Sequence, residues 1–121
     1  MSTRANVDLP GIVELTSPAA PVSSPVQTNT CGRGVKLFIN VPTYTSGSFT
    51  VSLQGVFGGV AYTILTSASI SSAGLSVLTV YPAVTVTANV SVSDAVPRQW
   101  QILVTPTSFV GVVNIGACVI V

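Results

Sequence analysis

From about residue 34 onwards, apolar and polar residues alternate with a period of two, so that successive side chains would point to opposite faces of a β-strand. The run 35–41 has valine, leucine or isoleucine at every second position, and the run 48–54 has serine, threonine and glutamine between its apolar residues. Both runs predict strands with one buried face. We expect Pro42 to end the first strand and residues 43–47 to form a turn.

The same period predicts further strands in the rest of the chain. The segments that carry it are 60–67, 75–81, 84–92, 100–104 and 109–121. Residues 75–81 are apolar on both faces, which is typical of a central strand covered on both sides. Residues 55–59 contain three glycines and predict a hairpin loop that carries Phe57. Since no helical period occurs, we predict an all-β single domain, either an antiparallel β-sandwich or a jelly roll.

The first 30 residues have a different composition. They contain half of the eight prolines, at positions 10, 18, 21 and 25. Proline at this density excludes helix and central strand and favours extended chain, so only residues 11–16 have the pattern of a short strand. We therefore expect an extended proline-rich N-terminal arm over residues 1–30 and a β-sandwich domain over residues 31–121. The arm is expected to be either disordered or laid along a partner.

Charged residues are scarce, at 6% of the 121 residues, and the net charge is +1. The seven are Arg4, Asp8, Glu14, Arg33, Lys36, Asp94 and Arg98. A soluble monomer normally covers itself with charged side chains, whereas uncharged hydrogen-bonding groups suit surfaces that end up against protein. A net charge near zero also lowers the repulsion between copies. The composition predicts an assembly subunit, and a neutral domain that acts alone is the alternative.

The sequence contains no set of residues for catalysis or metal binding. It has no histidine, and its three acidic residues are spread over the chain, so we expect no enzyme activity, no catalytic residue, no metal and no cofactor. The low charge indicates no nucleic-acid partner. No apolar run reaches the length of a spanning helix and the N-terminus lacks a signal-peptide pattern, so we expect no membrane partner. Without an export signal, Cys31 and Cys118 are expected to be thiols rather than a disulfide.

Asp94 and Arg98 are the closest pair of opposite charges in the sequence, and the single tryptophan follows at Trp100. We interpret the pair as a structural brace for a turn, with the Arg98 stem packed near Trp100. A binding role for the pair is the alternative.

The second half of the chain resembles a family of small proteins encoded in tailed-phage structural modules. The matching motifs, in order, are Arg33-Gly-Val35, Tyr62-Thr-Ile-Leu65, Val77-Leu-Thr-Val-Tyr-Pro82, Ala88-Asn89, Asp94-x-x-Pro97-Arg98-x-Trp100 and Gly116-Ala-Cys-Val-Ile120. They cover about residues 33–121. Two positions depart from the family pattern: Ala83 stands where glycine is usual, and the hairpin before Tyr62 is shorter and uncharged.

The resemblance implies a virion component, and within that class a head decoration (cement) protein of a bacteriophage. Such proteins are β domains, often homotrimers, that bind the major capsid protein lattice and stabilise the head. The protein would then be made in the host cytoplasm and reside on the capsid exterior. The expected partner contacts are arm and loop-tip residues: Val7, Leu9, Ile12, Val22, Val26 and Phe57.

Two other functions remain open at this point. A tail, fibre or baseplate adaptor would also be a structural virion protein, differing in copy number and position. A carbohydrate-binding β-sandwich module belongs to another class, and the small number of aromatic and acidic residues counts against it.

Overall fold

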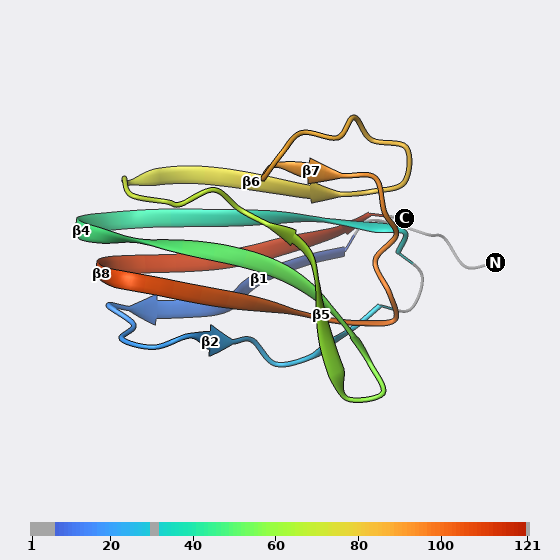
Figure 1. The fold of residues 1–121 in the computed structure, drawn as a ribbon, viewed down its shortest axis with the longest axis horizontal. Helices are drawn as coiled ribbons and strands as arrows, with labels where there is room; N and C mark the ends of the chain where they lie inside the picture. Colours follow the sequence, from blue (N-terminus) through green and yellow to red (C-terminus); the bar gives the residue numbers. More distant parts are fainter. Residues whose placement is uncertain (1–6, 30–31, 121) are drawn as a thin grey trace.

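Two long strands, β4 (Gly34–Phe57) and β8 (Gln99–Ile120), pair antiparallel along most of their length and organise the fold (Figure 1). The structure is a computed structural model that describes residues 7–29 and 32–120. The remaining strands are β1 (Val7–Thr16), β2 (Val22–Ser23), β3 (Gln27–Thr28), β5 (Val60–Thr66), β6 (Gly74–Val80) and β7 (Ser91–Val92). The described residues contain no helix, which confirms the predicted all-β single domain.

Both long strands bend back at the same end of the molecule, so each contributes to two layers (Figure 1). The bend of β4 shows as register shifts between Asn40 and Ser48, and Gly47 has a φ of +79° there. The ladder continues through both bends, so the expectation that Pro42 ends a strand is wrong. Pro42 falls in the irregular stretch of the ladder, where a missing N–H is tolerated.

One layer has the order β1, second half of β8, first half of β4, β6 and β7. The other layer consists of β2 and β3, the first half of β8, the second half of β4, and β5. The inward-facing residues of both layers form one apolar core. Its largest fully buried members are Trp100, Phe49, Leu37, Ile39, Leu53, Ile102 and Ile115. The alternation in residues 35–41 and 48–54 therefore places one face of each run in this core.

The described part of the N-terminal arm belongs to the β domain. β1 pairs with residues 112–119 of β8, and β2 and β3 pair with its first half. The expectation of an arm outside the domain therefore does not hold for residues 7–29. Proline does not prevent this pairing, because Pro10 lies at a register shift of β1 and Pro18 lies between strands.

The strand predicted over residues 84–92 is almost entirely an irregular loop, and only its last residues form β7. Local side-chain hydrogen bonds compete with strand pairing here. The Ser91 hydroxyl donates to the Thr85 carbonyl oxygen at 2.6 Å and accepts from the Thr87 N–H at 3.0 Å. Asn89 has a φ of +61°, which turns the chain out of the extended conformation.

β6 is an edge strand over most of its length, and the prediction of a doubly covered central strand is wrong. β7 covers only its last two residues. Leu75 is 62% exposed and Val77 is 37% exposed, whereas Leu78 and Val80 face the core. The sequence pattern of two apolar faces therefore reflects one core face and one open face.

Candidate interaction surface

The end of β4 and β5 form a hairpin that projects from the body of the molecule (Figure 1). Phe57 pairs with Val60, so the connection is a two-residue turn of Gly58 and Gly59. Both glycines have positive φ, +60° and +81°, which is the conformation of a type I′ turn. The turn thus holds the side chains on either side of it in fixed positions.

The tip of this hairpin is apolar and open to solvent. Phe57 is 84% exposed, Val60 is 68% exposed and Tyr62 is 47% exposed. Phe57 and Val60 are direct partners, and Tyr62 lies two residues further along the same face of β5. We call these three residues the tip strip.

The tip strip continues the core face of β4 beyond the sandwich. Val51 and Leu53 are fully buried, and Phe57 follows at the same alternation. The Tyr62 ring and Pro97 lie so close to Gly55 that a Cβ there would collide with the ring. The hairpin therefore presents a core-like surface that the layer of β1, β6 and β7 does not cover, and exposed apolar surfaces of this kind are candidates for protein binding.

A row of polar side chains stabilises the other face of the hairpin. Gln101 donates from Nε2 to Oε1 of Gln54 at 2.8 Å, and Ser52 and Thr66 share a hydroxyl hydrogen bond of 2.9 Å. These contacts link β8, β4 and β5 in register. The hairpin is thus braced from behind while its apolar face stays open.

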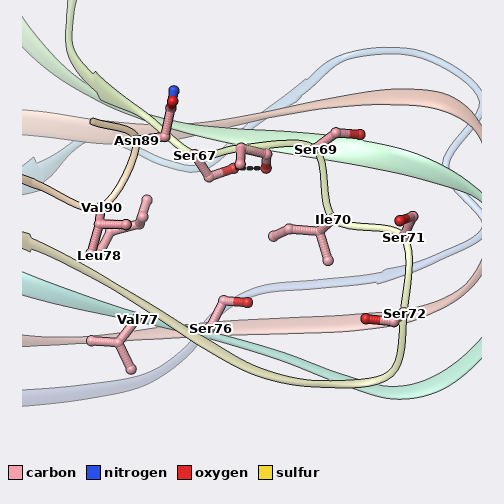
Figure 2. Close-up of a pocket in the computed structure, with 11 residues that line it drawn as sticks. Ser67, Ser69, Ile70, Ser71, Ser72, Ser76, Val77, Leu78, Asn89 and Val90 are labelled. Atoms are coloured by element: carbon pink, nitrogen blue, oxygen red, sulfur yellow. Dashed lines mark hydrogen bonds between the residues drawn. The ribbon is translucent and has the colours of Figure 1, made fainter. Parts of the chain in front are cut away.

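A hollow of about 260 Å³ lies beside β6 (Figure 2). Its lining residues are Ser67, Ala68, Ser69, Ile70, Ser71, Ser72, Ser76, Val77, Leu78, Asn89 and Val90. The lining has no charged and no aromatic side chain, so it offers neither an acid–base pair nor a stacking surface for a sugar ring. This composition gives no support to the carbohydrate-binding alternative.

Comparison with protein-family models, curated proteins and solved structures finds no match to this chain.

The described residues contain no cluster of histidine, cysteine, aspartate and glutamate that could hold a metal ion. Within the same residues, no helix is long and apolar enough to span a membrane. The tip strip and the open edge of β6 are the exposed apolar features that the proposals below use.

The turn at residues 94–98 is held differently from the expected ionic brace. Asp94 and Arg98 both belong to the described residues and are exposed, and no ion pair joins their side chains. The Asp94 carboxylate instead accepts a hydrogen bond from the Ala95 N–H at 2.8 Å. The tie comes from Asn29, whose backbone N–H donates to the Arg98 carbonyl oxygen at 2.6 Å and whose Nδ2 donates to that of Val96 at 3.2 Å. Isolated charges at an exposed turn gain little from pairing, so the partly buried amide is the stronger tie.

Trp100 is fully buried in the core, and its Nε1–H has no hydrogen-bond partner among the described residues. The Trp100 ring therefore contributes to the packing of the core. The sequence pattern predicts its burial, because Trp100 begins an alternating run with Ile102 and Val104, which are also fully buried.

The predicted contact residues are distributed over different environments. Leu9 and Ile12 pack partly buried against the core, and Val22 is half-buried, so these three serve the domain's own packing. Val26 is 47% exposed. The side chain of Val7 lies outside the described residues. Phe57 is therefore the predicted contact that the structure presents most fully.

Sequence reasoning missed Val60 and Tyr62 as partners of Phe57. The signal was present, because two adjacent glycines between alternating runs specify a two-residue hairpin turn. That turn makes Phe57 and Val60 opposite neighbours. A loop over residues 55–59, as predicted, would not place Phe57 opposite Val60.

Proposed function

We propose that this protein is a structural virion protein that decorates a bacteriophage capsid and stabilises it by binding the major capsid protein lattice. The family resemblance of residues 33–121 supports the virion role. The observation in the structure that carries the proposal is the tip strip, an apolar surface on a braced hairpin that extends beyond the domain's own core.

The chemistry of the tip strip defines the surface it would bind. No charged residue lies between Lys36 and Asp94, so recognition by this hairpin depends on apolar burial and hydrogen bonds. Phe57 would act as the aromatic anchor, since exposed aromatic side chains that fill a pocket dominate the energy of protein interfaces. The complementary site is an uncharged apolar pocket on the capsid exterior.

Stabilisation would follow from mass action. A protein that binds the assembled lattice but not the free subunits shifts the equilibrium towards the lattice. Weak contacts repeated over many copies sum to a large effect when the copies are also linked to one another. Self-association, as a homotrimer in the family that the sequence resembles, is part of the proposal, as is location on the capsid exterior after synthesis in the host cytoplasm.

The test is co-sedimentation of the purified protein with capsids that lack it, taken from the phage that encodes it. We expect saturable binding and a higher temperature of capsid disruption in the presence of the protein. Phe57→Ser should weaken binding at each site by roughly tenfold or more, because it removes the anchor.

Val86→Ser is the matched control, since Val86 is 64% exposed on a loop apart from the hairpin. It should bind as the unmodified protein does. Absence of binding to capsids, or equal loss with Phe57→Ser and Val86→Ser, would contradict the proposal.

A further inference from the structure

The outer edge of β6 has free backbone hydrogen-bonding groups. Thr79 and Tyr81 donate their N–H groups to the carbonyl oxygens of Val90 and Val92, away from β4. Because backbone groups alternate in direction along a strand, those of Leu75 and Val77 point to the same side. No described strand pairs with β6 there, since β7 covers only its last two residues.

This edge lacks the features by which proteins normally prevent pairing with other chains. Edge strands are usually protected by a charged side chain, a proline, a bulge or a covering segment. Residues 74–78 contain neither a charge nor a proline, and their pairing with β4 runs without a register shift. On the open face, Leu75 and Val77 add exposed apolar side chains to the free backbone groups.

The free edge has the length and symmetry of a self-complementary contact. It begins at Gly74, where a φ of +129° turns the chain, and it ends before Thr79, the first residue of β6 that pairs with β7. Ser76 is the midpoint of these residues. Two such edges placed antiparallel about Ser76 would join Leu75 of each copy to Val77 of the other by paired backbone hydrogen bonds.

We propose that β6 pairs with β6 of a second copy of this chain, antiparallel about a twofold axis at Ser76. The contact joins two β4–β6 layers into one continuous sheet and places Leu75 against Val77 of the partner on the open face. The hollow lined by Ser76, Ile70 and Leu78 lies beside this part of β6 (Figure 2). This inference is independent of the virion function and concerns only the free protein in solution, whereas the homotrimer of the proposed function would form on the capsid through other surfaces.

Sedimentation equilibrium over roughly 1 µM to 1 mM tests the contact, because a short edge predicts a weak, reversible association in this range. We expect a monomer–dimer equilibrium. Leu75→Lys should weaken it by at least about tenfold, since it sets charge and a long side chain into the contact. Val86→Lys is the control, because Val86 has nearly the same exposure as Leu75, 64% against 62%, and should leave the dimer unchanged.

Cross-linking gives a second readout that does not depend on affinity. In the proposed pairing the two copies of residue 76 form a non-hydrogen-bonded pair, whose Cα atoms lie about 4.5 Å apart, within the range of a disulfide. Ser76→Cys in a Cys31→Ser, Cys118→Ser background should therefore give a disulfide-linked dimer under mild oxidation. Ser71→Cys in the same background, an exposed residue on the rim of the hollow, should give little.

The proposal is overturned by a monomer at all concentrations, or by an oligomer, such as a trimer, that Leu75→Lys leaves intact. Equal cross-linking of Ser76→Cys and Ser71→Cys would also overturn it. Circular dichroism of each variant shows whether the domain has folded, and the cross-linking result stands even where a lysine variant is unstable.

Discussion

The rings of Phe49 and Phe109 meet edge to face, with their centroids 4.8 Å apart and their planes at 67°. Phe49 follows the bend of β4 and Phe109 lies at the bend of β8, and both are buried. The pair fills the core at the end where the two layers are joined. The contact therefore supports the bends that turn two long strands into two layers.

Replacing Phe109 by alanine is expected to lower the free energy of unfolding by about 3–5 kcal/mol, because it leaves a cavity and removes the ring contact. Chemical denaturation of the purified protein measures this change. Phe109→Leu retains most of the volume and should cost less. A change below about 1 kcal/mol for the alanine variant would show that the bends do not depend on this pair.

Gly111 and Gly74 provide a matched test of crowding at the bend. Both have positive φ, +152° and +129°. A Cβ at Gly111 would collide with the Thr43 carbonyl oxygen, whereas nothing lies within 4 Å of one at Gly74. We expect Gly111→Ala to lower the free energy of unfolding by roughly 3 kcal/mol or more, because it adds a collision to backbone strain. Gly74→Ala should lower it by about 1 kcal/mol, because only backbone strain acts there. Equal costs in thermal unfolding would contradict the close approach of the strands.

Variants of Asn29 and Asp94 test whether the turn at residues 94–98 is held by the hydrogen bonds of Asn29 or by an ion pair between Asp94 and Arg98. Asn29→Ala removes side-chain hydrogen bonds to the Gly32 and Val96 carbonyl oxygens and should cost about 1–3 kcal/mol. Asp94→Ala removes an exposed hydrogen bond to Ala95 and should cost less than about 1 kcal/mol. The denaturation midpoints of the two variants measure these losses. A larger loss of stability for Asp94→Ala than for Asn29→Ala would favour the interpretation that the Asp94–Arg98 pair holds the turn.

The exposed tip should be dispensable for folding. Phe57 is 84% exposed, so Phe57→Ser is expected to change the free energy of unfolding by no more than about 0.5 kcal/mol. Thermal unfolding checks this directly. A large loss of stability would mean that the ring supports the hairpin, and the effect of the same variant on binding would then have a structural cause.

The core was largely predictable from the sequence, because a period of two identifies the buried face of each strand whatever the topology. Val35, Leu37 and Ile39 are buried as the alternation predicts. Strand ends were less predictable, because proline alone does not mark one: Pro42 lies in an irregular part of a continuous ladder.

Pairing partners depend on contacts distant in sequence, which local patterns do not specify. The segment 84–92 alternates like a strand, yet the hydrogen bonds of Ser91 and the turn at Asn89 hold most of it as a loop. β1 has the weak pattern of a proline-rich arm, yet the edge of β8 gives it a partner. Phe57 of the tip strip was predictable from the sequence. The positions of Val60 and Tyr62 beside it depend on the register of the β4–β5 hairpin, which the alternation alone does not specify.

Cryo-electron microscopy of intact virions of the encoding phage tests the proposed function most directly. The account predicts this β domain in regular array over the capsid exterior, with the hairpin that carries Phe57 against the major capsid protein. A head surface without the protein, or a few copies confined to the tail, would contradict it.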